Sequence, residues 1–127
     1  LSWIVCTRAI KTTEESCSKC HDESKEVLIA RVQTIHDNTF KLQRIAGETT
    51  AKAHTTIAAA KAAGATDEQL AQARLLVREA QWYWDWVAAE NGMGFHNIDK
   101  IMRTLGLSID RAHQAIEAAT ATVKGSL

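Results

Sequence analysis

Residues 23–63 read ESKEVLIARVQTIHDNTFKLQRIAGETTAKAHTTIAAAKAA. Apolar and small residues recur along this stretch in alternating steps of four and three, the spacing of a helix packed lengthwise against a partner helix. Large side chains give way to alanine and threonine after Leu42, so we expect a partner backbone to approach more closely in the second half. Only Gly47 interrupts the helix, at a cost of about 1 kcal/mol relative to alanine. The expected seam comprises Leu28, Val32, Ile35, Thr39, Leu42, Ala46, Thr49, Ala53, Thr56 and Ala60.

Two more helices are expected after this one. Gly64 is a suitable residue to end the first helix, and Thr66 with Gln69 has the spacing of a capping box. The second helix should end near Asn91-Gly92, and Asn97 can cap a third. The two expected buried stripes comprise Leu70, Ala73, Val77, Ala80, Trp84 and Val87, then Ile98, Ile101, Leu105, Ala112, Ile116, Ala119 and Val123.

The sequence therefore predicts an all-α fold of long antiparallel helices in a three-helix arrangement, with one very long arm. The absence of proline and the abundance of alanine agree with this class. We divide the chain into a segment over residues 1–22 and a long-helix region over residues 23–127. The chain starts with leucine, which fits a processed or truncated protein, so any export signal is expected upstream.

Composition excludes two classes of partner. Fifteen Lys plus Arg balance fifteen Asp plus Glu, and this zero net charge argues against the broad basic face that binds nucleic acid. No apolar run approaches the roughly 18 residues of a membrane span.

The chemistry-bearing motif is Cys17-Ser18-Lys19-Cys20-His21. Two thiols at this spacing can each add to a vinyl group of one haem, and the following histidine can then ligate the iron. A zinc site is an alternative, but structural zinc needs a fourth ligand and usually a second paired cluster. A thioredoxin-type dithiol normally follows a strand, and no strand is expected here. The remaining cysteine, Cys6, has no partner and is interpreted as a small semi-buried thiol.

His96 is a second candidate ligand because it lies in a glycine-flanked loop between two helices, where ligands are commonly presented. From its position alone, an axial iron ligand and an exposed loop histidine are equally acceptable interpretations. His36, His54 and His113 fall within expected helices, which favours solvated or hydrogen-bonded histidines. The aromatic cluster over residues 81–86 favours core packing over contact with a haem edge. No nucleophile–base pair or phosphate-binding loop accompanies these residues.

Five short motifs, taken in order, resemble the C-terminal region of ammonia-forming, pentahaem cytochrome c nitrite reductase. The similarity runs from roughly Lys11 to Val123. In that family, a five-haem periplasmic subunit reduces nitrite to ammonium with six electrons. The motifs are Cys17-Ser18-Lys19-Cys20-His21, Arg31-Val32-Gln33-Thr34-Ile35, Ala63-Gly64-Ala65-Thr66, Ala80-Gln81-Trp82 and Gly94-Phe95-His96-Asn97.

The resemblance implies roles for four residues and several partners. Cys17 and Cys20 would anchor the last haem c, His21 would be its proximal ligand, and His96 would be the distal ligand of the preceding haem. The helices after the haem motif would form a homodimer interface. The implied electron sources are the upstream haems of the same chain and a quinol-linked or small cytochrome donor. The implied location is the periplasm, with the signal peptide upstream.

The chain also departs from the family pattern. The family's lysine-ligated haem, its calcium site and the Arg, Tyr and His that hold nitrite lie upstream and have no counterpart here. The family places a distal histidine shortly before the final haem motif, whereas residues 1–10 contain none. Because the nitrite-binding residues lie upstream, we expect that this segment does not reduce nitrite alone. The haem that it carries is expected to have two histidine ligands and to relay electrons.

Two other interpretations remain open at this point. A stand-alone monohaem carrier would take its sixth ligand from His96, His54 or His36. A haem-free helical interaction module would carry the cysteine motif incidentally or use it for zinc.

Overall fold

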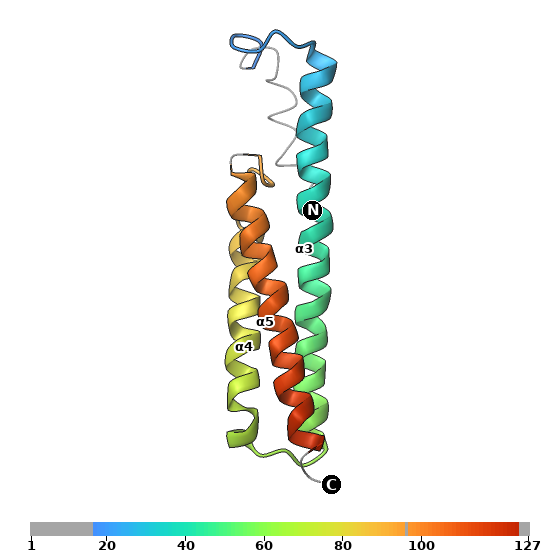
Figure 1. Cartoon of the computed structure of the whole chain (residues 1–127), viewed down its shortest axis with the longest axis vertical. Coiled ribbons are helices and arrows are strands. Elements are labelled where there is room, and N and C mark those ends of the chain that lie inside the picture. The colour runs from blue at the N-terminus through green and yellow to red at the C-terminus, as the bar shows by residue number, and fades with distance from the viewer. Residues whose placement is uncertain (1–16, 96, 125–127) are drawn as a thin grey trace.

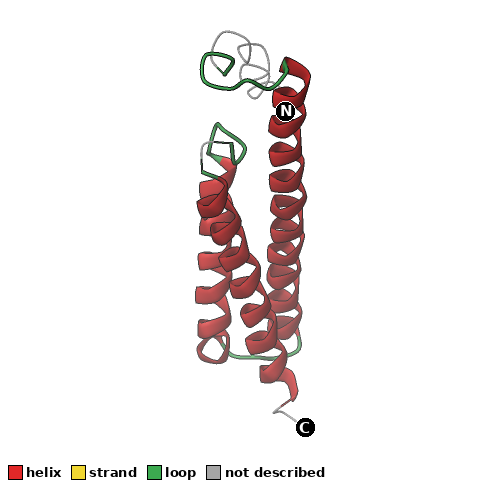
Figure 2. Ribbon diagram, turned by 45° about the horizontal axis from the view of Figure 1, so that its top comes forward, coloured by secondary structure: helices red, strands yellow, loops and turns green. Residues whose placement is uncertain are grey.

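A computed structural model describes residues 17–95 and 97–124. Three helices make up this part of the chain: α3 (Lys25–Ala62), α4 (Asp67–Ala88) and α5 (Ile98–Lys124). They run antiparallel in sequence order and lie side by side, and no strand occurs within the described ranges (Figures 1 and 2). The predicted all-α, three-helix arrangement with one long arm is confirmed.

Both ends of α3 are explained by local chemistry. At the start, the Ser24 hydroxyl accepts a hydrogen bond from the backbone N–H of Val27 at 3.5 Å. At the end, Gly64 adopts a φ of 101°, a backbone conformation that residues other than glycine rarely adopt. The N–H of Gly64 then bonds to Lys61 O and that of Ala65 to Ala60 O, both at 3.1 Å, which is a Schellman motif.

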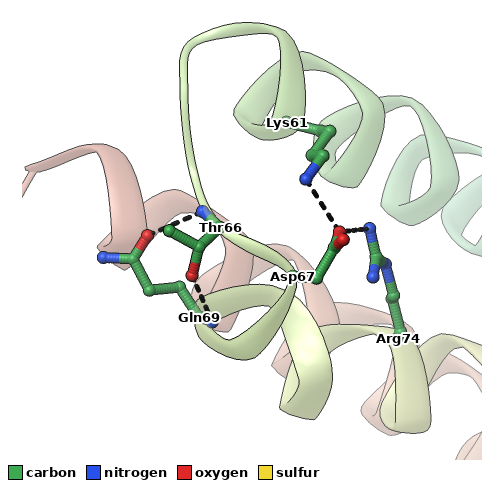
Figure 3. A network of polar contacts seen from close by, with 5 residues as sticks. All are labelled: Lys61, Thr66, Asp67, Gln69 and Arg74. Atoms are coloured by element: carbon green, nitrogen blue, oxygen red, sulfur yellow. Dashed lines mark hydrogen bonds and ion pairs between the residues drawn. The ribbon is translucent and has the colours of Figure 1, made fainter.

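The α3–α4 turn is closed by a compact polar network (Figure 3). The expected capping box is present: the Thr66 hydroxyl accepts from Gln69 N at 3.2 Å, and the Gln69 side chain accepts from Thr66 N at 2.8 Å. Asp67 pairs with Lys61 and Arg74, each at 2.8 Å. The hydrogen bond from Lys61, followed by the one from Arg74, lowers the pKa of Asp67 below its usual value. All five residues lie close together in the sequence, so this turn is specified locally.

The seam of α3 follows the predicted pattern in one half of its positions. The residues seven apart are buried, but Thr50 and Ile57 are buried in the places expected for Thr49 and Thr56, which are half-exposed. A straight helix with 3.6 residues per turn rotates by about 20° per heptad relative to a strict seven-residue repeat. After several heptads, the next residue along therefore faces the core. The confirmed seven-residue positions are Val32, Thr39, Ala46, Ala53 and Ala60.

The α4 stripe agrees with the prediction, and Leu76 joins it. In α5, the prediction was wrong at both ends, because Ile98 and Val123 are 37% and 40% exposed and lie at the two ends of the helix. Ser108 and Ala115 are fully buried instead. The Ser108 hydroxyl donates to Ala80 O at 2.8 Å, so its hydrogen bond is met across the α4–α5 contact. The confirmed buried residues are Leu70, Ala73, Val77, Ala80 and Val87 in α4, and Ile101, Leu105, Ala112 and Ala119 in α5.

Gly47, in the middle of α3, allows a tryptophan to lie against the helix backbone. The indole N–H of Trp84 donates to Gln43 O at 2.9 Å. A Cβ on Gly47 would lie 3.0 Å from that indole nitrogen, closer than a side chain normally packs. Trp84 and Trp86 are half-buried against the core, whereas Trp82 is 61% exposed. The core-packing interpretation of the aromatic cluster is therefore correct for two of its three tryptophans.

α5 packs extensively against both other helices, whereas α3 and α4 touch each other less. A shallow, largely apolar groove remains between α3 and α4. Within the described ranges, no helix contains an uncharged apolar stretch of the length a bilayer requires. The groove is lined by Phe40, Gln43, Arg44, Gly47, Trp84 and Ala88.

Candidate functional site

The cysteine motif forms one tight turn just before α3. Both Cys20 N and His21 N donate to Cys17 O, at 3.1 Å and 3.0 Å. This turn holds the two cysteines close together and places His21 directly after them. Cys17 is half-buried, Cys20 is exposed, and both are free thiols. Two accessible thiols in one turn, followed directly by a histidine, fit covalent haem attachment with axial ligation.

His21 presents a defined nitrogen to a ligand. Its Nδ1 lies 3.5 Å from Oε2 of Glu23, and the two side chains are 59% and 55% exposed. Because Nδ1 faces the carboxylate, Nε2 is the nitrogen that would ligate iron. Within the described ranges, the cysteine turn included, no group of three or more His, Cys, Asp or Glu side chains is placed to share a metal ion.

The second predicted ligand, His96, lies outside the described residues, but the loop before it makes specific contacts with α3. Gly94 has a φ of 83° and packs directly on α3. An added Cβ would collide with the Thr39 hydroxyl and lie 3.6 Å from Ile35 Cγ2. The Thr39 hydroxyl is fully buried and has no hydrogen-bond partner in the part of the chain that the structure describes. The loop is therefore held against α3 so tightly that only glycine fits.

Further polar contacts fix the same loop. His36 bonds to the backbone of Gly92, and the Glu90 carboxylate accepts a 3.4 Å bond from Gly94 N. Burial of the imidazole lowers the pKa of His36 from its usual 6.5, while Asp37, Gly92 and Glu90 oppose that shift. His36 is thus hydrogen-bonded, as predicted. The contact of Thr39 with Gly94 could not be predicted, because no sequence spacing links α3 to this loop.

The start of α3, which follows the cysteine turn, is far along the helix from its contact with the Gly94 loop. Thr39 lies about four turns beyond Lys25, which corresponds to roughly 20 Å at about 1.5 Å per residue. A metal–imidazole bond is only about 2 Å long. Figure 1 shows the same separation, with α3 extending well past the α4–α5 loop toward residues 17–24.

Two further histidines lie away from these sites. His54 and His113 are exposed on helix faces, in agreement with the prediction of solvated side chains. Cys6 and residues 1–10 lie outside the described residues.

Comparison with known proteins identifies the family. The model of the cytochrome c552 family matches residues 6–126. The chain belongs to the cytochrome c552 family. This cytochrome is 40% identical over 111 residues to the cytochrome c nitrite reductase subunit NrfA of Nitratidesulfovibrio vulgaris, covering 82% of this chain and 21% of that protein. It is also 40% identical over 105 residues to cytochrome c-552 of Bacteroides fragilis, covering 80% and 21%.

A solved structure agrees with these relatives. Cytochrome c nitrite reductase from Desulfovibrio desulfuricans superposes with a TM-score of 0.83 at 33% identity, over 91% of this chain and 26% of that one. The resemblance to a region of cytochrome c nitrite reductase is confirmed, and haem c is the cofactor that a cytochrome c family implies. The cytochrome spans about a fifth of the length of the curated relatives it matches.

Proposed function

We propose that this cytochrome is the C-terminal, electron-transferring and dimer-forming segment of a periplasmic multihaem nitrite reductase. The single observation that carries the proposal is the Cys17–His21 turn, which offers two thiols and an imidazole in a member of the cytochrome c552 family. Cys17 and Cys20 would hold one haem c covalently, and His21 would be its proximal ligand. The bound haem supplies one-electron redox chemistry.

His96 would ligate a second haem, bound to an upstream part of the same protein. The roughly 20 Å between the start of α3 and the Gly94 contact supports two separate irons over one. The same distance argues against the stand-alone carrier in which His96 completes the coordination of the Cys17–Cys20 haem. An iron with a histidine on both sides has no open position for substrate, which suits electron relay.

The whole enzyme would reduce nitrite to ammonium with six electrons. Its substrate-binding haem, calcium site and signal peptide would lie in the upstream part, and a quinol-linked or small cytochrome would supply electrons. The division at residues 22 and 23 would separate the haem-attachment segment from the long helices. This segment alone would be inactive toward nitrite.

The groove between α3 and α4 supports self-association. Phe40 lines its α3 side and is 48% exposed, and the half-buried Trp84 lines it from α4. An apolar groove with an exposed aromatic side chain is typical of a surface that another helix covers. The partner would be a second copy, packed through the long helices.

The test is a reduced-minus-oxidised visible spectrum with intact mass, on this chain exported to a periplasm with haem-attachment machinery. We expect one covalent haem with a low-spin spectrum, absent from a Cys17→Ser, Cys20→Ser variant. A folded, exported chain of helical content without haem would contradict the proposal and favour the haem-free interaction module.

A further inference from the structure

We infer that Glu23 is a positioning residue for the haem ligand His21 and that its carboxylate lowers the reduction potential of the haem iron. This inference rests on the proposed attachment of haem at Cys17 and Cys20. The observation behind it is the 3.5 Å approach of the Glu23 carboxylate to Nδ1 of His21.

The chain holds these two side chains near each other from both directions. On one side, the bond from His21 N to Cys17 O fixes the backbone of His21 at the end of the cysteine turn. On the other side, Glu23 immediately precedes Ser24, the residue that caps α3. Only Asp22 lies between them, so the contact needs no distant element of the fold.

A carboxylate on Nδ1 has two consequences for iron bound at Nε2. It fixes the ring tautomer and orientation, and it makes the imidazole a more basic ligand. A more basic ligand with a nearby negative charge favours ferric over ferrous iron, which lowers the potential. Low potential suits a haem that passes electrons toward a reductive site.

The contact is not explained by folding stability. Both side chains are more than half exposed, and ion pairs exposed to this extent contribute little to stability. The nearby Glu26 already bonds within the first turn of α3, to its own backbone and to Ser24, and these bonds lower its pKa. Glu23 is thus the acidic side chain that the structure directs to His21.

Asp22 provides a matched control. It is exposed, carries the same charge and is adjacent to His21 in sequence, but among the described residues the ion pair of that imidazole is with Glu23. Glu23→Gln and Asp22→Asn therefore remove one negative charge each, but only Glu23→Gln removes the carboxylate from Nδ1.

The experiment is a spectroelectrochemical titration of the haem-loaded chain and the two variants. We expect Glu23→Gln to raise the reduced-to-oxidised ratio at a fixed potential about tenfold, which is 59 mV for one electron. Asp22→Asn should shift the reduction potential by less than half as many millivolts as Glu23→Gln does. Equal shifts in both variants, or no shift in Glu23→Gln, would overturn the inference.

Failure of this inference is distinguishable from failure of the proposed function. Intact mass and the visible spectrum report haem attachment before any potential is measured. A chain without covalent haem contradicts the proposed function and the inference together. A normal low-spin haem whose reduction potential is the same in the Glu23→Gln variant contradicts the inference alone.

Discussion

The two connections between helices use glycine for different physical reasons. Gly64 in the α3–α4 turn and Gly94 in the α4–α5 loop both have positive φ, at 101° and 83°. A Cβ added to Gly64 would meet nothing within 4 Å, whereas one added to Gly94 would collide with Thr39. The turn needs glycine for its own backbone, and the loop needs it also to touch another helix.

This difference extends to the polar contacts. The bonds of the turn join residues within one short stretch, from Lys61 to Arg74. The loop instead bonds to His36 and packs on Thr39, more than fifty positions away in sequence. A loop that precedes a proposed iron ligand is therefore positioned by tertiary contact, and substitutions can separate the two cases.

The largest expected effect is that of Gly94→Ala. The substitution forces alanine into a left-handed conformation and pushes it into Thr39, so the free energy of unfolding should fall by about 3 kcal/mol. Urea unfolding of the haem-loaded chain, followed by circular dichroism, measures this loss. Gly64→Ala is the matched control, with only the conformational cost of about 1 kcal/mol. Equal losses in the two variants would show that the Thr39 contact adds nothing.

Gly47 is a third case, because a tryptophan packs closely against it although its φ is not positive. Alanine there gains about 1 kcal/mol of helix propensity but displaces the Trp84 indole, so we expect little net change in stability. Trp84→Phe removes the bond to Gln43 and should cost about 1 kcal/mol. In the Trp84→Phe background, Gly47→Ala should stabilise by about 1 kcal/mol, a coupling that a double-mutant cycle measures. Additive effects would contradict the contact.

The smallest expected effects are on the pH dependence of stability, which should differ between the α4–α5 loop and the α3–α4 turn. Burial holds the folded-state pKa of His36 below 6.5, so the unfolded chain binds more protons and stability falls as pH drops below that value. Lys61 and Arg74 hold the pKa of Asp67 below 3.8, so its contribution is present above that pH and is lost as pH falls through the lowered pKa.

His36→Gln should flatten the stability profile just below pH 6.5, and Asp67→Asn should flatten it only below about pH 4. Thermal unfolding across this pH range tests both variants. Interchanged windows, or no change in either variant, would contradict the assignment of His36 to the loop and Asp67 to the turn.

Local features of the fold were predictable from the sequence. The three helices, the Thr66 and Asn97 caps and the Gly64 terminus depend on residues within one or two turns of each other. The haem motif is local too, since one turn contains both cysteines and His21. The burial of Thr50 in place of Thr49 was not predictable, because it depends on how far a straight helix rotates along its partners.

The linear pattern was enough to show that this cytochrome is helical, roughly where its helices lie, and which turn offers thiols and imidazole to a haem. The end of α4 was an exception, because the helix stops at Ala88, before the predicted Asn91-Gly92. Backbone hydrogen bonding and capping act over a few residues, so a linear pattern records them. The reasons why Gly47 and Gly94 are glycine, and the exact buried faces of α3 and α5, became clear from the packed helices. Those outcomes depend on close packing between segments distant in sequence, where a single added methyl group has nowhere to go.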